Sequence, residues 1–277
     1  MTYLNLGCGA HFHADWTNID LVPCSPLVLA HDVRKGIPFP NEYFDAVYHS
    51  HLLEHFPKDS ALPFLQECHR VLKPGGTLRV VVPDLESIVR NYLSMLEQAE
   101  AGAPEAAAKH DWMLLELYDQ AVRTASGGEM ARVLCGPSIR QNRFVLERMG
   151  AEADPNIQNT KHTSSTDRTR VSVRQRLTQL IPSRLETARR CVRIIAGGQG
   201  EKAFMDGLFR QAGEVHLWMY DRLSLQCLLE NAGFVNIRRC RADESHIPAF
   251  SCYQLDVEGG ITRKPDSLFM EGMKGGR

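Results

Sequence analysis

Short apolar runs alternate with polar connectors over the first part of the chain. Several runs are apolar at nearly every position, which is typical of strands buried on both faces of a parallel sheet. The first two connectors leave room for about one helical turn, less than a usual crossover helix needs. The pattern therefore predicts an α/β sheet with short first crossovers. The strands it predicts are residues 3–6, 17–20, 27–31, 44–49 and 78–82.

Helices are predicted around the fourth and fifth of these strands. A short one covers residues 52–56, and a longer one covers residues 61–71. The longer helix should end in a turn at residues 72–76, where a proline prevents continuation and two glycines allow the chain to reverse. Residues 85–98 have apolar positions with a period of about 3.6 residues, which indicates an amphipathic helix.

Residues 99–215 show no strand pattern. They favour helices separated by polar or glycine-rich breaks, such as residues 125–128 and 196–198. Together with the preceding helix, they form one long predicted insertion. We therefore expect a core made of residues 1–84 and 216–277, and a helical insertion of residues 85–215.

The strand pattern returns near the C-terminus. Asp221 is a predicted N-cap for a helix over residues 223–231, which Gly233 should end. Residues 234–240 and 267–274 are the last two predicted strands. The order of elements predicts a sheet that receives strands from both ends of the chain.

Composition and charge exclude several classes of protein. The 277 residues are 43% hydrophobic and 23% charged, as in ordinary globular proteins, and the formal net charge of −1 gives no strong field for nucleic acid. No apolar run reaches about eighteen residues, so no membrane span is predicted. The eight cysteines show no metal-knuckle or redox spacing. They favour a reducing compartment, and we expect the protein in the cytoplasm.

Candidate binding residues stand where the first three strands end. Gly7 and Gly9 form a turn after the first strand, where backbone N–H groups can approach a ligand closely. Asp20 ends the second strand, and a carboxylate there can accept both hydroxyl hydrogens of a ribose. Asp32 follows the third strand, where it can accept from an adenine amine. The ends of parallel strands thus predict a nucleotide-like ligand.

Further motifs follow in the same order: Phe44-Asp45-Ala46-Val47-Tyr48, then Leu53-Glu54-His55, then residues 70–76. With these motifs the chain resembles the class I S-adenosylmethionine-dependent methyltransferases over residues 3–84, and more loosely over residues 216–240. The resemblance implies a Rossmann-like seven-stranded sheet with one antiparallel strand, S-adenosylmethionine as the cofactor, and methyl transfer to a nucleophile. The cofactor-binding residues that it implies are Asn5, Leu6, Gly7, Cys8, Gly9, Asp20, Asp32, Val33, His49 and Ser50.

The chain departs from that family at three positions. Asn5 stands where the family has an acid, His11 stands where it has a third glycine, and Asp20 follows Gly9 by only eleven residues. The rival Rossmann class, which binds nicotinamide cofactors, requires the third glycine and an acid about twenty residues on, and this chain has neither. The ligand predicted by the resemblance therefore remains S-adenosylmethionine, held by a loop rather than by a full helix.

His51-Leu52-Leu53-Glu54-His55 matches the His-x-x-Glu-His pattern of some zinc peptidases. His51, Glu54 and His55 are accordingly candidate ligands of a divalent metal. This stretch also resembles one in ubiquinone-type O-methyltransferases, and that resemblance likewise implies a divalent metal. A peptidase would not explain the glycine turn or the strand-end acids, so a metal hydrolase is the less favoured class. We favour the alternative that Glu54 and His55 cap and pack a helix without metal.

Two histidines are candidates for the base that takes the acceptor's proton. His51 is the first choice because it should lie beside the reactive methyl group, as His49 and Ser50 should, and His216 is the second. Trp218 and Tyr220 either form the floor of a sugar or ring site or belong to the core. In-line displacement depends mostly on alignment, so a base is not strictly required.

Residues 161–193 are rich in arginine and partly amphipathic. Such a segment could contact an anionic membrane surface, meet a phosphorylated acceptor, or form a solvated helix face, and the last reading is favoured. Membrane contact would place the protein at the inner surface of the membrane.

Residues 216–221 and 264–271 resemble bacterial methyltransferases associated with surface glycans. That resemblance implies O-methylation of a sugar or another small hydroxyl acceptor. The alternative from a different class is a non-catalytic, cofactor-binding partner or regulatory subunit. The oligomeric state stays open.

Overall fold

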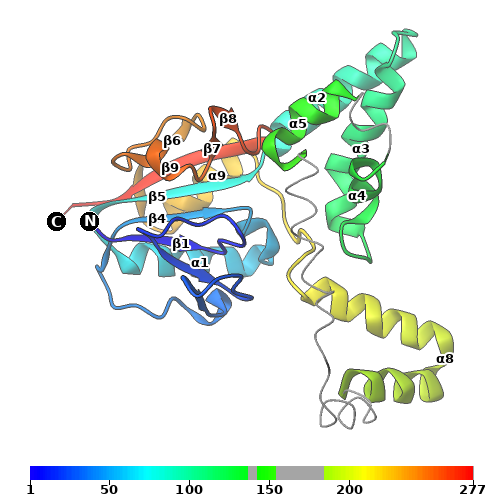
Figure 1. The fold of residues 1–277 in the computed structure, drawn as a ribbon, viewed down its shortest axis with the longest axis horizontal. Helices are drawn as coiled ribbons and strands as arrows, with labels where there is room; N and C mark the ends of the chain where they lie inside the picture. Colours follow the sequence, from blue (N-terminus) through cyan, green and yellow to red (C-terminus); the bar gives the residue numbers. More distant parts are fainter. Residues whose placement is uncertain (137–141, 154–183, 277) are drawn as a thin grey trace, which may run out of the picture.

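The computed structural model describes residues 1–136, 142–153 and 184–276. A seven-stranded sheet lies at its centre (Figure 1), with the strand order β3-β2-β1-β4-β5-β9-β6. Only β9 runs antiparallel to its neighbours among these paired strands. The fold is therefore the α/β mixed sheet that the sequence predicts. Its strands are β1 (Tyr3–Leu6), β2 (Thr17–Asp20), β3 (Val28–Ala30), β4 (Phe44–Ser50), β5 (Leu72–Pro83), β6 (Phe234–Cys240) and β9 (Ser267–Lys274).

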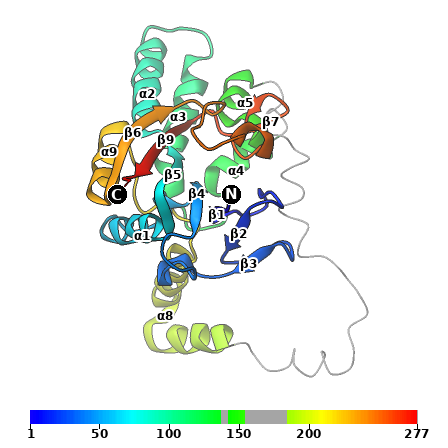
Figure 2. The ribbon, with the colours of Figure 1, turned by 90° about the vertical axis from the view of Figure 1, so that its left-hand side faces the viewer.

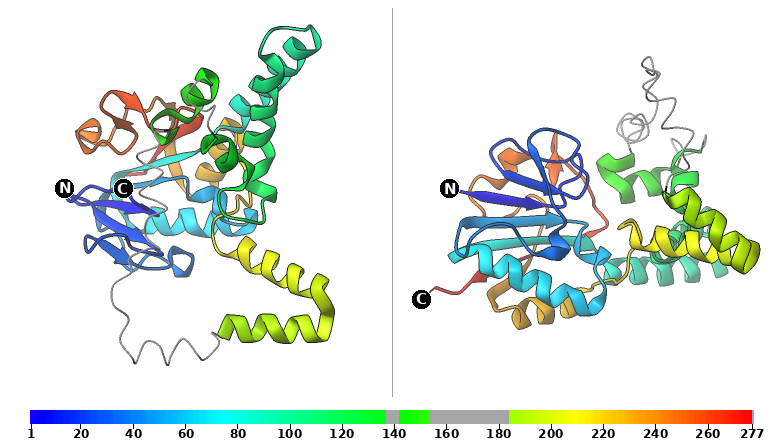
Figure 3. Two further views of the ribbon diagram at one scale, coloured as in Figure 1. Left: turned by 45° about the vertical axis from the view of Figure 1, so that its right-hand side comes forward. Right: turned by 90° about the horizontal axis from the view of Figure 1, so that it is seen from below.

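Helices α1 (Lys58–Val71) and α9 (Arg222–Asn231) cover one face of the sheet (Figure 3, right). The alternation of side chains along each strand separates two cores. In β1, Leu4 and Leu6 join the core under the helices, whereas Tyr3 joins a second core on the opposite face. Residues 241–266 cover that second face with a short helical turn, η6 (Phe250–Tyr253), and the hairpin β7 (Val257–Glu258) and β8 (Ile261–Thr262), which the sequence analysis did not predict.

Two local predictions are wrong. The turn expected at residues 72–76 is already part of β5, which begins at Leu72 and pairs with β4 across an irregularity in register. Gly75 takes a left-handed backbone there, with φ of +78°, so the strand absorbs the glycines as a local distortion. Residues 52–56 form only a 3₁₀ turn, η2 (Leu53–His55), instead of a helix with one continuous face.

The first two crossovers are as short as predicted. Residues 7–16, which link β1 to β2, contain turns and loop but no helix. The first helical turn after β3 is η1 (Val33–Lys35), which Asp32 caps by accepting a hydrogen bond from the Arg34 N–H. The carboxyl ends of β1, β2 and β3 are therefore bordered by loops.

The insertion lies beyond the carboxyl ends of the parallel strands (Figure 1), and helices α2 and α3 lie side by side in it (Figure 2). It has a small apolar core of its own around Trp112 and Met113. The predicted break at residues 196–198 is a kink at Gly197, whose backbone is left-handed. The described helices are α2 (Leu85–Glu100), α3 (Ala106–Val122), α4 (Gly128–Leu134), α5 (Arg143–Met149) and α8 (Arg184–Gln211), with the 3₁₀ turn η4 (Gly150–Ala153).

The C-terminal elements follow the prediction closely. Asp221 is the N-cap of α9 and forms a reciprocal capping box with Ser224. None of the described helices is long and apolar enough to cross a membrane. Of the basic segment 161–193, residues 161–183 lie outside the described residues, and the rest begins α8.

Candidate active site

The glycine turn after β1 is held in place by Asp20. Gly7 and Gly9 have φ of +62° and +53°, a conformation that side chains other than glycine rarely adopt. A Cβ atom on Gly7 would come within 2.8 Å of the Leu52 side chain, so the position also needs glycine for space. Asp20 Oδ2 accepts a hydrogen bond from the Gly9 N–H at 2.8 Å, and Oδ1 accepts from the Val22 N–H at 2.9 Å. The strand-end carboxylate thus orders the turn.

Two cavities meet at this turn, and Gly7 and His51 line both of them. Cavity A has a volume of about 200 Å³ and cavity B about 300 Å³. The residues around cavity A are Asn5, Gly7, Cys8, Gly9, Ala10, His11, Tyr48, Ser50, His51, Arg263 and Lys264. Those around cavity B include Gly7, Asp20, His31, Asp32, Val33, Arg34, His51, Leu52 and His55.

Eight of the ten predicted cofactor residues line one of these cavities, and two do not. Leu6 is fully buried in the apolar core under the helices. The His49 side chain is also fully buried, with its ring 5.3 Å from that of Phe64. Both side chains point to the helix-covered face, because they lie on strands whose alternate residues face the cavities.

Asn5 and Asp32 are engaged within the protein. The Asn5 amide donates to the His11 carbonyl and to Asn18 Oδ1, each at 3.2 Å, so it holds the loop that replaces the first crossover helix. Asp32 accepts from Arg34 Nε at 2.8 Å, and this hydrogen bond lowers the pKa of Asp32. Asp32 therefore presents an ionised carboxylate at the edge of cavity B.

His51 stands between the two cavities. Its backbone is left-handed, with φ of +50°, which turns the chain sharply after β4. The Nε2 atom lies 2.8 Å from Ser267 Oγ, and the Nδ1 atom lies 3.2 Å from Glu54 Oε1. An imidazole whose Nδ1–H faces a carboxylate keeps a lone pair on Nε2, so this nitrogen can accept a proton.

Glu54 is buried among three histidines. Its pKa is raised by burial, but the neighbouring His51, His216 and His55 outweigh that effect and lower it below the usual range. Burial lowers the pKa of His216 to about 3 and also lowers that of His55, so both imidazoles are neutral at neutral pH. His216 is 5% exposed, and its ring packs against that of His55 at 4.9 Å. It therefore lies behind the cavity wall.

The structure brings together a group of possible metal ligands that differs in one member from the candidates His51, Glu54 and His55. Because residues 53–55 form a 3₁₀ turn, His51 and His55 do not share the face of an α-helix. Among the described residues, the group whose ligand atoms lie within 4.8 Å of one another is Glu54, His55 and His216. His216 takes the place that the sequence pattern gave to His51.

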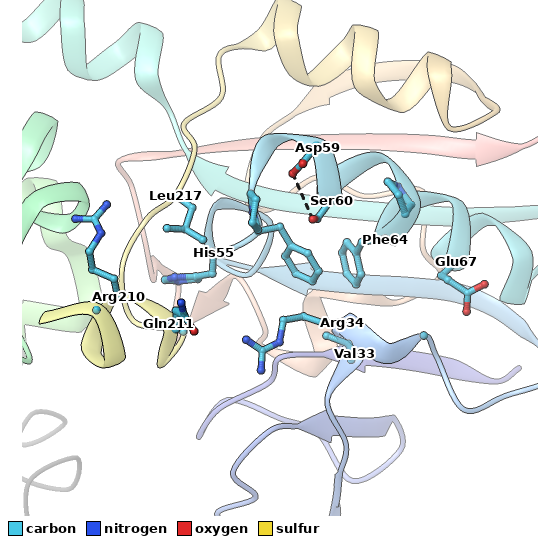
Figure 4. A pocket seen from close by; sticks show the side chains of 16 residues that line it. Val33, Arg34, His55, Asp59, Ser60, Phe64, Glu67, Arg210, Gln211 and Leu217 are labelled. Atoms are coloured by element: carbon cyan, nitrogen blue, oxygen red, sulfur yellow. Dashed lines mark hydrogen bonds between the residues drawn. The ribbon is translucent and has the colours of Figure 1, made fainter. Parts of the chain in front are cut away.

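A larger cavity, cavity C, adjoins cavity B (Figure 4). Its volume is about 910 Å³, and it shares Val33, Arg34, His55, Phe56 and Gly213 with cavity B. Its other walls come mainly from α1, from α8 and from the segment after α8. They include the polar Asp59, Ser60, Glu67, Arg210 and Gln211 and the apolar Pro63, Phe64 and Leu217.

Trp218 and Tyr220 do not floor this cavity. Tyr220 is buried in the core under the helices, as the alternative reading expected. Trp218 packs under the Lys58 ammonium at 4.5 Å. Cavity C offers both apolar side chains, such as Phe56 and Phe64, and polar ones, such as Arg210 and Gln211.

Residues 4–80 match the family model described as a methyltransferase domain. This part of the chain is therefore similar to a methyltransferase domain. The match ends within β5, before the insertion begins. The cofactor implied by the family is S-adenosylmethionine, and the glycine turn with its strand-end acids lies wholly inside the matched residues.

The chain is also similar to several solved structures. One is a chain from the complex of a Haloferax volcanii methyltransferase with the activator Trm112, with 12% identity, coverage of 99% of this chain and 82% of that one, and a TM-score of 0.38. Another is a possible histamine N-methyltransferase from Thermotoga maritima, with 12% identity, coverage of 99% and 82%, and a TM-score of 0.37. No curated protein matches the chain.

The sequence analysis missed the two cationic side chains that line cavity A. Arg263 and Lys264 reach it from the C-terminal loop. That loop is anchored where Tyr48 donates to Asp256 Oδ1 at 2.5 Å and where the buried Arg79 pairs with Asp256 and Glu271 at 2.7 and 2.9 Å. The sequence does contain one sign that this loop is anchored. Arg79 is the charged residue in the apolar run 78–82, and a buried arginine must be paired with an acid.

Replacing Asp20 by alanine is expected to weaken the binding of S-adenosylhomocysteine by about 10- to 100-fold, because a charged acceptor contributes about 1.5–3 kcal/mol. Isothermal titration calorimetry checks this, with Asp243→Ala, an exposed acid paired with Arg241, as the control. The same titration with a product analogue that lacks the ribose hydroxyls separates two effects of the variant: loss of a direct contact with the ribose, and loss of order in the glycine turn. Equal losses for both ligands would mean that Asp20 acts only by ordering the turn.

His49 is expected to make the stability of the fold sensitive to acid. Burial lowers its pKa to about 4, so the unfolded chain takes up a proton below about pH 6.5 while the folded chain does not. Stability contributed by the neutral ring is complete above pH 6.5 and is lost as the pH falls toward 4. Urea unfolding of His49→Leu measures this. Relative to the unmodified chain, its free energy of unfolding should rise by up to about 3 kcal/mol from pH 7 to pH 4.

Phe64→Leu, which alters the same contact without a titrating group, is the control for the His49 experiment. Its free energy of unfolding should shift by a constant amount over this pH range. A parallel pH dependence in His49→Leu and the unmodified chain would contradict the assignment.

Proposed function

We propose that the chain transfers the methyl group of S-adenosylmethionine to a hydroxyl group of a polar acceptor, such as a sugar unit of a glycan. The observation that carries the proposal is the position of His51, which lines both cavities at the glycine turn. A cofactor that spans the two cavities would have its sulfonium centre near this residue. Asp59, Arg210 and Gln211 in the wall of cavity C supply polar groups that can hydrogen-bond a hydrophilic acceptor.

The cofactor would lie along the ends of the strands. Cavity A, with Arg263 and Lys264, suits the carboxylate of the methionine part, and cavity B, with Asp20 and Asp32, suits the ribose and adenine. Gly7 lines both cavities and, because it has no side chain, does not block the path between them.

The proposed step is an in-line displacement. The acceptor oxygen forms a bond to the methyl carbon while the carbon–sulfur bond breaks, and the sulfur keeps the electron pair as a neutral thioether. His51 Nε2 takes the hydroxyl proton, in the place that the Ser267 hydroxyl occupies now. Glu54, which faces Nδ1, stabilises the imidazolium that forms. His216 is too deeply buried to reach the acceptor and is not proposed as the base.

The insertion would cover the acceptor. Helix α8 supplies Gly207, Arg210 and Gln211 to the wall of cavity C. Near the kink of α8, Ile194 and Ile195 are 83% and 85% exposed, beside a series of arginines. Exposed apolar residues next to cations suit the surface of an anionic membrane. We therefore propose a cytoplasmic enzyme that meets a membrane-linked acceptor there.

The acceptor class is tested with cofactor labelled in its methyl group. Monosaccharides, a lipid-linked glycan, a simple phenol and a primary amine are offered in parallel, and the product is identified by mass spectrometry. We expect a methoxy group on the sugar acceptors. Label only on the amine or the phenol would contradict the proposed acceptor, and a chain that binds neither S-adenosylmethionine nor its product would favour the non-catalytic partner.

A further inference from the structure

Glu54 is a buried carboxylate that is only partly compensated: His51 Nδ1 lies 3.2 Å from its Oε1 atom, but not in good hydrogen-bond geometry. Its side chain is fully buried, and within the described part of the chain neither carboxylate oxygen accepts a hydrogen bond of good geometry. Burying a charged group without such partners is costly, and proteins do so mainly where another cation compensates. The arrangement around Glu54 therefore requires an explanation beyond packing.

We propose that Glu54, His55 and His216 bind a divalent cation, most favourably Zn²⁺. The three side chains come from η2 and from the segment after α8, and their ligand atoms lie within 4.8 Å of one another. His216 Nε2 is 3.9 Å from Glu54 Oε1. Zinc bonds of about 2.0–2.2 Å place tetrahedral ligands about 3.4 Å apart, so small side-chain rotations close the site.

Hydrogen bonds hold the two halves of this site together. The Leu217 and Trp218 N–H groups both donate to the main-chain carbonyl of Glu54, at 2.7 and 3.2 Å. The His216 N–H donates to the Gln120 carbonyl at 2.9 Å. The ligands are thus fixed by backbone bonds, as a preorganised metal site requires.

The tautomer of His55 is also the one that a metal needs. Its Nδ1 lies 3.1 Å from the Val215 carbonyl, which can only accept, so Nδ1 carries the proton. The lone pair is then on Nε2. A ligating histidine typically donates its other ring N–H to a carbonyl or carboxylate in this way.

Two histidines and one glutamate form a donor set that catalytic zinc sites use, with a fourth position left open. His55 lines cavities B and C, so an open position can be reached from that side. A cation there could bind the oxygen of the acceptor and lower the pKa of its hydroxyl, a role that rests on the proposed function. The binding of the cation itself does not rest on it.

The test measures metal binding directly on the full chain without an affinity tag. After treatment with a chelator, Zn²⁺ is titrated against a chromophoric competitor, and bound metal is counted by elemental analysis. We expect one Zn²⁺ per chain, and a loss of affinity of at least about 10-fold in Glu54→Gln and in His216→Asn. His110→Asn, which alters a histidine of α3 that faces Tyr92, is the matched control and should retain the metal.

Cobalt substitution identifies the ligands. Co²⁺ bound by nitrogen and oxygen should show tetrahedral d–d bands without thiolate charge transfer, which excludes the exposed cysteines such as Cys24 and Cys252. If Glu54→Gln does not fold, His55→Asn and His216→Asn carry the test, with circular dichroism as the folding control. Less than about 0.1 metal per chain, or unchanged affinity in these variants, would overturn the proposal. A failed acceptor screen would leave the metal count unaffected.

Discussion

Replacing His51 by asparagine is expected to slow methyl transfer by about 10²- to 10⁴-fold, which is the usual contribution of a positioned acid or base. Asparagine suits this position because it tolerates the left-handed backbone that His51 adopts, with φ of +50°. It keeps a polar group beside Ser267 but cannot accept a proton. The rate of a single turnover, measured with labelled cofactor, isolates this step from product release.

The affinity for S-adenosylhomocysteine separates catalysis from binding in this variant. It should change by less than about threefold, because the proposed contacts to the cofactor come from other residues. His69→Asn, on the far side of α1 against Phe234, is the matched control and should leave both quantities unchanged. A normal single-turnover rate in His51→Asn would mean that alignment alone drives the transfer.

Most of the sheet could be predicted because its signals are local. The bounds of β1, β2, β6 and β9 follow directly from short apolar runs and their flanking turns. The capping residue Asp221 and the break at Gly197 were also readable from the sequence. The start of β5 was not, because Pro74 and Gly75 are turn residues that pairing with β4 retains in a distorted strand.

The site was predictable only where it follows the ends of the strands. Gly7, Gly9 and Asp20 lie at the same edge of the sheet by topology alone. The Glu54–His216 approach and the cations of cavity A depend on segments far apart in sequence. No local periodic pattern in the sequence predicts such contacts. What the sequence does show is the residue type that must be compensated, as with a glutamate or an arginine inside an apolar stretch.

Arg79 illustrates that point and carries the largest expected effect on stability. Its guanidinium is fully buried, pairs with Asp256 and Glu271, and donates to the main-chain carbonyls of Arg241, Ala242 and Glu244. Arg79→Met should lower the free energy of unfolding by about 3–5 kcal/mol, since it leaves buried carboxylates without their cation. Urea unfolding at neutral pH measures this. Arg90→Met, which removes an exposed pair with Glu86, should cost less than about 1 kcal/mol.

The same substitution should reach the cofactor through the C-terminal loop. Asp256 accepts from Arg79 and Tyr48, and its carbonyl accepts from the Arg263 N–H at 2.9 Å, so releasing Arg79 loosens the segment that brings Arg263 to cavity A. S-adenosylhomocysteine should therefore bind more weakly to folded Arg79→Met, although Arg79 lies in none of the three cavities. Adding Glu271→Met should recover part of the stability, because the second variant removes one of the stranded charges. If stability returned without cofactor affinity, Asp256 rather than Glu271 would be the carboxylate that couples Arg79 to cavity A.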